Sequence, residues 1–202
     1  MLTLFHAPQS PSSRLVWLIE ELGADCTIEY CDIRRMDGTG APDPRNPHPD
    51  GEVPALIHNE ALATESAAVA LYLTDLFPEA NLGAAVGSMD RAAYLTWLAW
   101  FAGEMEPAMC GKISGATETD PHAQNRYDQA MSRLLEALWS GPFLMGDRFT
   151  AVDVLTGASL RWGREHLPDS PLFDPYLERL MQRPGWIRAQ ARDSEIQARA
   201  AA

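Results

Sequence analysis

The stretch LTLFHAPQSPSSRLVWLIEELG, residues 2–23, decides the fold of the first part of the chain. Residues 2–6 form a short apolar run that stops at an Ala-Pro pair, which predicts a strand followed by a turn. Ser10 and Pro11 then offer a suitable N-cap and first-turn pair, and Gly23 is placed to end a helix. The apolar residues between them recur at the spacing of an amphipathic helix: Leu15, Leu18, Ile19 and Leu22.

The rest of the first eighty residues continues to alternate strand and helix signals. A second strand is predicted over 27–33, and a Pro- and Gly-rich loop over 34–52. A hairpin of residues 53–57 and 60–63 follows, and Thr64-Glu65-Ser66 opens another helix. The order strand, helix, strand, loop, strand, strand, helix indicates an α/β domain over residues 1–80.

Strand signals disappear after the segment FPEANLGAAVGS, residues 77–88. We place a linker at 81–88 and an all-helical second domain at 89–202. Thr150 and Asp153 have the spacing of a capping box, in which each side chain satisfies the other residue's backbone N–H, and we assign them a structural role. Helical spacing is found in four segments, around residues 93–105, 121–139, 150–162 and 175–182.

The charge balance excludes several classes of partner. The 202 residues include 16 basic and 28 acidic side chains, a formal charge of −12. Nucleic acids and anionic membranes need clustered Lys and Arg, so we expect neither as a partner. Residues 1–80 carry four arginines, no lysine and thirteen acids, hence −9. An anion bound there needs backbone N–H groups, helix N-termini or one of Arg14, Arg34, Arg35 and Arg45.

Three cysteines, Cys26, Cys31 and Cys110, form no CxxC pair and no zinc-ligand spacing. We therefore predict no metal site. Sparse, unpaired cysteines are typical of reduced thiols, and no apolar run reaches the ~20 residues that span a bilayer. We expect a cytoplasmic protein without a membrane segment.

The predicted turn of residues 6–13 is the place to look for chemistry. The order of elements in the first domain is that of a thioredoxin-like unit, in which this turn usually presents a reactive group to the first helix's N-terminus. The turn has no cysteine. Protein disulfide reductase chemistry is therefore disfavoured, and we expect the site to act on a thiol that a ligand supplies.

Over essentially its whole length the chain resembles the cytosolic glutathione transferases, in particular bacterial members of the theta-like and beta-like serine type. The combination of Val-Pro, a Glu-Ser pair about ten residues later and a Phe-Thr-x-x-Asp box is specific to that resemblance. Four segments carry it: LTLFHAPQSPSSRLVWLIEELG, NPHPDGEVPALI, ATESAAVALYL and GDRFTAVDV. The resemblance implies a thioredoxin-like domain followed by an all-helical domain.

The resemblance also implies a glutathione site. The bond before Pro54 is cis in the family, and the backbone of the residue at Val53 pairs with the cysteinyl part of glutathione. Glu65 and Ser66 match residues that hold the γ-glutamyl end, where a carboxylate accepts from the ammonium and a hydroxyl donates to the carboxylate. Simple capping of the helix is the alternative interpretation. Arg14 and His48 are further candidate ligands.

Ser10 matches the serine or cysteine position of theta-like and beta-like members. A hydroxyl there donates to the bound sulfur and lowers the thiol pKa without acting as a nucleophile. Ser12 and Ser13 are alternatives, because a gap in the turn shifts the register. A purely structural role for Ser10, capping the helix, is equally compatible with its Pro11 neighbour.

Glu52 departs from the family pattern, because many members have Lys just before the Val-Pro pair. Its charge opposes glutathione unless Arg34, Arg35, Arg45 or His48 compensates.

The resemblance implies a pocket for a small apolar electrophile. His6, Trp97, Phe101, Met105 and Trp162 are candidate wall residues, although aromatic and Met stripes at helical spacing are more often core. For His6, a structural histidine with its polar atoms satisfied is the alternative interpretation. The expected activity is that of a homodimeric glutathione transferase with glutathione as co-substrate. The alternatives are a non-catalytic binding protein of the same fold and a glutathione-dependent isomerase or dehalogenase.

Overall fold

The computed structural model describes residues 1–200, which form two compact units. One unit consists of residues 1–80 together with the C-terminal segment from Arg183, and the other consists of residues 81–182. The predicted boundary after residue 80 coincides with this division. The predicted second domain, 89–202, was too long at its C-terminal end, because the last helix packs on the first unit. The predicted linker, 81–88, falls inside the second unit.

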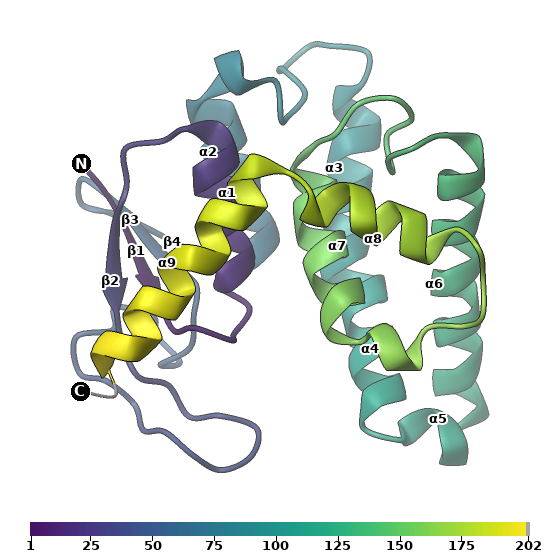
Figure 1. The fold of residues 1–202 in the computed structure, drawn as a ribbon, viewed down its shortest axis with the longest axis horizontal. Helices are drawn as coiled ribbons and strands as arrows, with labels where there is room; N and C mark the ends of the chain where they lie inside the picture. The colour runs from purple at the N-terminus through teal and green to yellow at the C-terminus, as the bar shows by residue number, and fades with distance from the viewer. Residues whose placement is uncertain (201–202) are drawn as a thin grey trace. The chain divides into compact units, whose positions relative to one another are not determined.

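The first unit contains a thioredoxin-like mixed sheet of four strands (Figure 1). The strands are β1 (Leu2–His6), β2 (Thr27–Tyr30), β3 (Ala55–His58) and β4 (Ala61–Thr64), in the order β2-β1-β3-β4. β1 pairs with β2 in parallel and with β3 antiparallel, and β3 and β4 form the predicted hairpin. β2 ends three residues earlier than predicted, at Tyr30.

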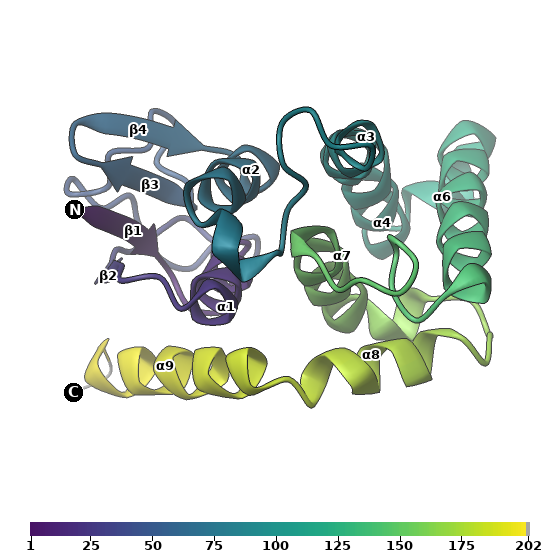
Figure 2. The same ribbon diagram turned by 90° about the horizontal axis from the view of Figure 1, so that it is seen from above.

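Three helices complete this unit: α1 (Ser13–Leu22), α2 (Ser66–Leu76) and α9 (Pro184–Ala200). α1 is buried along most of its length, and its buried residues include the apolar ones that the sequence pattern identified. α9 runs alongside α1 (Figure 2). It was not predicted as a helix of the first unit, because its sequence is mostly polar and Ala-rich.

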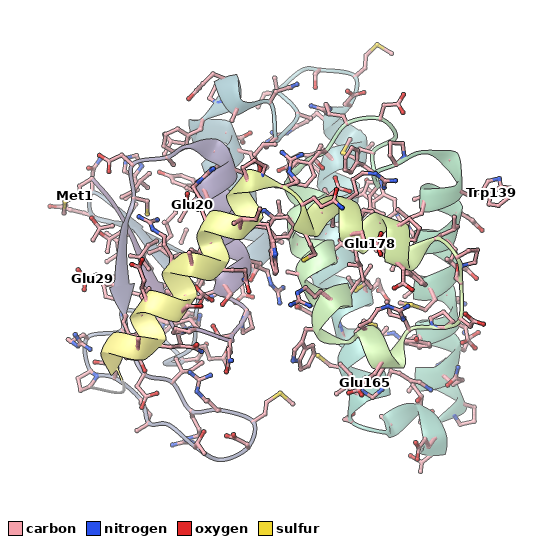
Figure 3. All side chains as sticks on the ribbon, in the orientation of Figure 1. Met1, Glu20, Glu29, Trp139, Glu165 and Glu178 are labelled. Carbon is pink, nitrogen blue, oxygen red and sulfur yellow. The ribbon has the colours of Figure 1, made fainter. Side chains whose placement is uncertain are left out.

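Polar contacts fasten α9 to α1. Glu20 of α1 lies beside α9 (Figure 3), where it accepts from Nε of Arg188 at 2.7 Å and pairs with Nη1 of Arg192 at 3.0 Å. The rings of Trp17 and Trp186 meet edge to face at 5.0 Å. The pairing of α9 with α1 therefore depends on side chains more than 160 residues apart in sequence.

The second unit is helical, as predicted. Its helices are α3 (Arg91–Trp100), α4 (Glu106–Ile113), α5 (Ala116–Thr119), α6 (Pro121–Ser140), α7 (Ala151–Trp162) and α8 (Phe173–Met181). A π-helical segment, Phe101–Met105, joins α3 to α4, and a short 3₁₀ turn lies at Arg164–His166. The 3₁₀ turn at Pro78–Ala80 belongs to the first unit. α7 is buried on almost every side, which agrees with its nearly uniform apolar sequence.

Asp153 organises the start of α7. Its carboxylate accepts from the backbone N–H of Thr150 and of Leu144, each at 2.9 Å, and from the hydroxyl of Tyr176 at 3.1 Å. The Thr150 hydroxyl lies 3.2 Å from the same carboxylate. Burial nevertheless outweighs these hydrogen bonds and raises the pKa of Asp153 to about 6.

None of the helices in the described part of the chain is long and apolar enough to cross a membrane.

Candidate functional site

Three segments meet at one edge of the sheet because of the strand registers. Phe5 of β1 faces Ala55 of β3, and Ala55 faces Thr64 of β4. β1 and β4 end at this edge and β3 begins there. The turn after His6, the peptide bond before Ala55 and the start of α2 after Thr64 are therefore neighbours, although they are spread over about sixty residues of sequence.

The turn after β1 folds around the hydroxyl of Ser10. Its Oγ donates to the carbonyl of Ala7 at 2.6 Å and accepts from the N–H of Ser12 at 3.2 Å. α1 begins at Ser13, and Ser12 occupies the N-cap position that the sequence predicted for Ser10. Ser10 still satisfies one backbone N–H of the first turn, so it carries part of a cap's role.

Ser12 and Ser13, the alternatives to Ser10, are engaged with other groups. Ser12 is fully buried, and its Oγ lies 2.7 Å from Nδ1 of His6 and 2.7 Å from Oγ of Ser10. Ser13 donates to Oδ2 of Asp193 at 2.6 Å. Ser10 is half-buried and precedes the helix, so of the three hydroxyls it is the one that we retain as the candidate catalytic group.

His6 lies inside the first unit rather than on a pocket wall. The ring is fully buried, and its Nε2 lies 3.0 Å from Oδ1 of Asp193, within ion-pair distance but without hydrogen-bond alignment. The prediction that His6 lines an acceptor pocket is therefore wrong, because Ser12 and Asp193 enclose the ring from α1 and α9.

The Val53–Pro54 peptide bond is cis and directly precedes β3. Val53 is buried, whereas Glu52 is exposed. The side-chain amide of Asn46 donates to the carbonyl of Glu52 at 2.8 Å and thereby ties the long loop to the cis bond. This segment thus has a fixed backbone beside the turn that contains Ser10.

Glu65 and Ser66 lie at the N-terminus of α2. Glu65 is exposed, has a positive φ of 66°, and makes no capping hydrogen bond to the helix. A positive φ is unfavourable for a non-Gly residue, and such conformations concentrate at functional sites. The capping interpretation of the Glu65 side chain is therefore not supported, and its carboxylate is available for a ligand.

The structure separates the candidate cations of the first unit. Arg45 is held by Asp43, with Nη2 2.6 Å from the carboxylate, and the pairing lowers the pKa of Asp43 to about 2. His48 is buried and accepts from the N–H of Asp50 through Nδ1 at 3.1 Å, so it serves the loop turn. Arg14 is buried within α1. Arg35 donates to the carbonyl of Pro8 at 3.2 Å and so reaches the turn with Ser10.

The predicted acceptor residues of the second unit do not gather on one surface. Phe101 and Met105 belong to its core and are almost completely buried. Trp97 packs edge to face on Trp100, and the guanidinium of Arg133 lies 4.7 Å from both rings. Trp162 is 60% exposed. The core interpretation therefore holds for two of the four residues.

No group of three His, Cys, Asp or Glu side chains with metal-binding geometry is present among residues 1–200 that the structure describes.

Sequence reasoning missed Asp193 as a site residue. It comes from α9, 180 residues after Ser13, and only the packing of α9 on α1 brings it to the turn. A lone Asp in a polar, Ala-rich segment gives no sequence signal for such a contact.

The residues of this sheet edge lie within a segment that resembles a known protein family. Residues 4–81 match the family model described as the glutathione S-transferase N-terminal domain. The first unit is therefore similar to the glutathione S-transferase N-terminal domain. The cis-proline segment and the start of α2 both lie within the matched residues. They are the places where the sequence resemblance predicts that glutathione binds.

The similarity to glutathione S-transferases extends beyond that domain. The chain is 28% identical over 193 residues to glutathione S-transferase GstA of Escherichia coli O157:H7, covering 90% of this chain and 93% of GstA. It is 26% identical over 202 residues to the disulfide-bond oxidoreductase YfcG of Escherichia coli K12, covering 91% and 92%.

Solved structures agree over nearly the whole chain. A glutathione S-transferase from Actinobacillus pleuropneumoniae has a TM-score of 0.81 at 26% identity, covering 96% of this chain and 93% of that one. A sphingomonad glutathione S-transferase complexed with glutathione has a TM-score of 0.79 at 26% identity, covering 95% and 98%. Together these similarities support the glutathione S-transferase family and a glutathione transferase enzyme.

Proposed function

We propose that the chain binds glutathione at the sheet edge and activates its thiol for attack on a small apolar electrophile. The observation that carries this proposal is the meeting of the Ser10 turn, the cis Val53–Pro54 bond and the α2 N-terminus. The similar sphingomonad enzyme is a complex with glutathione.

The binding mode follows from the backbone at that edge. An extended tripeptide can pair with the main chain of Val53, which lies just before β3 and is not part of a strand ladder. The exposed carboxylate of Glu65 then accepts from the γ-glutamyl ammonium, while Ser66 and the first N–H groups of α2 donate to the α-carboxylate.

The thiol is activated by the Ser10 hydroxyl. Its proton is directed to the Ala7 carbonyl, and rotation about the Cβ–Oγ bond turns the proton toward a bound sulfur. A hydrogen bond to the thiolate, together with the positive end of α1, lowers the thiol pKa, and each unit of that shift is worth ~1.4 kcal/mol in favour of the thiolate. The thiolate then forms a C–S bond to the electrophile, and the leaving group departs with the electron pair. Holding both substrates in one site supplies further acceleration.

We assign to Arg35 the role of offsetting the negative charge of the acidic side chains around the glutathione site. Arg35 contacts the Pro8 carbonyl, whereas Arg45 is committed to Asp43. Its charge favours a ligand whose thiolate form has a net charge of about −2, and it offsets the exposed Glu52.

We assign binding of the electrophile to the helical domain, where the exposed Trp162 is the remaining candidate contact residue. We expect a homodimer in the cytoplasm, as for the family.

Calorimetric titration with reduced glutathione, paired with turnover of a chlorodinitrobenzene, tests the proposal. Saturable binding with turnover is expected. The Glu65→Ala variant should bind glutathione about tenfold more weakly with its melting temperature retained, because a charge-assisted hydrogen bond is lost. Binding without turnover of any electrophile would instead favour the non-catalytic alternative, and absence of binding would contradict the proposal.

The similarity to YfcG favours a second reaction of the same thiolate. Attack on a disulfide forms a mixed disulfide with glutathione and releases the other sulfur as a thiolate, with no protein cysteine in the turn. Reduction of a small dialkyl disulfide by glutathione, measured beside the chlorodinitrobenzene assay, distinguishes the two reactions.

A further inference from the structure

A continuous line of polar groups runs from α9 to the Ser10 hydroxyl. Asp193 lies 3.0 Å from Nε2 of His6, Nδ1 of His6 lies 2.7 Å from Oγ of Ser12, and that oxygen lies 2.7 Å from Oγ of Ser10. His6 and Ser12 are fully buried, whereas Ser10 is half-buried. The line is therefore buried in its middle, and the proposed catalytic hydroxyl is the partly exposed group at the end that faces the sheet edge.

The burial of these groups needs an explanation. Nε2 of His6 and Oδ1 of Asp193 have no hydrogen-bond partner within the described residues other than this approach to each other. A buried imidazole beside a carboxylate is costly as a purely structural element, since apolar residues of similar size would fill the space without desolvating polar atoms. The Asp193 carboxylate, 3.0 Å from Nε2, would however stabilise the positive charge of the His6 ring after the ring gains a proton.

Each group can pass a proton to the next. With a proton on Nε2 facing Asp193, Nδ1 is an acceptor, and the Ser12 hydroxyl donates to it. The Ser12 oxygen in turn accepts from the Ala7 N–H at 3.2 Å and can accept from the Ser10 hydroxyl.

We propose that His6, Ser12 and Asp193 are positioning residues that take up the thiol proton of bound glutathione through Ser10. The inference rests on the proposed function, because it requires glutathione at the sheet edge. The S–H bond breaks as its proton moves to Oγ of Ser10. The Ser10 hydroxyl proton passes to Ser12, and the Ser12 proton passes to Nδ1 of His6.

The sum of these transfers moves one proton from sulfur to imidazole and leaves both hydroxyls neutral. The Nδ1–H of His6 then donates to Ser12, Ser12 donates to Ser10, and Ser10 donates to the thiolate, while the Nε2–H still faces Asp193. Hydrogen bonds aligned in this way strengthen one another. The imidazolium is held against the Asp193 carboxylate, so the buried positive charge is paired.

The other groups that face His6 do not compete for the proton. Just after β2, the Cys31 thiol contacts the His6 carbonyl, and burial raises the pKa of this thiol to about 11, which keeps it neutral. The N-cap of α1 contributes the Ser12 hydroxyl, and α9 contributes the Asp193 carboxylate, which also accepts from the Ser13 hydroxyl.

The Asp193→Asn variant tests the proposal, with Glu195→Gln, an exposed residue of the same helix, as the matched control. The readout is the ultraviolet thiolate absorbance of bound glutathione as a function of pH. Asp193→Asn should raise the pKa of the bound thiol by about one unit and lower kcat about tenfold, while the dissociation constant measured at a pH where bound glutathione is still a thiol stays unchanged. Glu195→Gln should titrate like the unaltered protein.

Proton counting gives a second readout that a structural role would not move. Calorimetry in buffers of different ionisation enthalpy measures the protons released on binding, and absorbance measures the thiolates formed. The unaltered protein should release fewer protons than the thiolates it forms, whereas His6→Gln should release one for each. Ser12→Ala leaves Asp193 and His6 in place and should also release one proton for each thiolate. It replaces His6→Gln in this experiment if His6→Gln does not fold.

The outcomes separate this inference from the proposed function. Two results would overturn the proton line alone. The first is that the unaltered protein binds glutathione as thiolate and releases one proton per thiolate. The second is that Asp193→Asn and Glu195→Gln give identical titrations. Failure of the unaltered protein to bind glutathione would overturn both the proton line and the proposed function.

Discussion

Glu21 and Arg183 form a paired contact between α1 and α9, in which Nε and Nη2 of the guanidinium donate to the two carboxylate oxygens at 2.9 and 2.8 Å. The Glu21 side chain is only 7% exposed, and it also accepts from the indole N–H of Trp17 at 2.9 Å. This contact fixes the first residues of α9 on the first unit. It therefore determines whether Asp193, two to three turns further along, reaches His6.

Loss of the Arg183 charge should destabilise the first unit. Arg183→Met leaves a nearly buried carboxylate without its cation, which is expected to cost about 1–3 kcal/mol of unfolding free energy. Arg188→Met removes a more exposed partner of Glu20 and should cost less than about 1 kcal/mol. Denaturant unfolding followed by Trp fluorescence measures both, and equal costs would contradict the importance of the Glu21 contact.

Gly185 should not tolerate a methyl group, because a side chain of α1 occupies the space that the methyl group would need. A Cβ on Gly185 would lie 2.5 Å from Cδ of Glu21, whose carboxylate is held by Arg183 and Trp17. Gly185→Ala is expected to destabilise by about 1–3 kcal/mol through overpacking, despite its better helix propensity. Gly111→Ala, in α4 with open space around the new atom, should stabilise by about 0.5–1 kcal/mol. Melting curves of the two variants should therefore shift in opposite directions.

Asp153 predicts a pH dependence of stability. Its pKa in the folded protein is about 6, against an ordinary value of 3.8, because burial disfavours the charged form. The folded state thus holds the proton more tightly than the unfolded chain. The carboxyl adds stability below about pH 4 that is lost as the pH rises through about 6, a change of about 2–3 kcal/mol.

The Asp153→Asn variant isolates this effect, because its amide does not ionise. The unfolding free energy of the unaltered protein minus that of Asp153→Asn should fall between about pH 4 and pH 7. Asp169→Asn, at an exposed position, should give a difference that stays nearly flat. A flat difference for Asp153→Asn would refute the raised pKa.

Reversal of the Glu52 charge should strengthen glutathione binding. Glu52 is exposed beside the cis bond, so Glu52→Lys removes a repulsive charge and adds an attractive one. The expected gain is about three- to tenfold in the dissociation constant at low salt, and it should shrink as salt screens the charges. Glu60→Lys, exposed in the hairpin turn at the opposite edge of the sheet, makes the same change in net charge. An equal gain from both variants would mean that net charge rather than position is responsible.

The sequence was sufficient for the elements whose local pattern is strong. The apolar spacing of residues 15–22, the hairpin turning at Asn59 and the Thr150 to Asp153 spacing all gave the right local structure, because propensity and packing agree there. The turn after His6, the Val53–Pro54 bond and the start of α2 lie at the same sheet edge for a reason that strand order and register supply.

Other parts depended on tertiary packing that no local pattern encodes. Phe101 and Met105 are core residues, and helical spacing alone does not distinguish a core stripe from a pocket wall. Asp193 joins the site only because Trp186, Arg183 and Gly185 hold α9 against α1. The partners of His6 depend on the same packing, because α9 brings Asp193 to the ring.

The most direct test of the central claim is the ionisation of bound glutathione in the Ser10→Ala variant. At saturating glutathione, the ultraviolet thiolate absorbance is followed across pH for the unaltered protein and the variant. Loss of the hydroxyl should raise the pKa of the bound thiol by about one unit or more and lower turnover about tenfold or more. An unchanged titration with unchanged turnover would contradict the assignment of Ser10 as the group that activates the thiol.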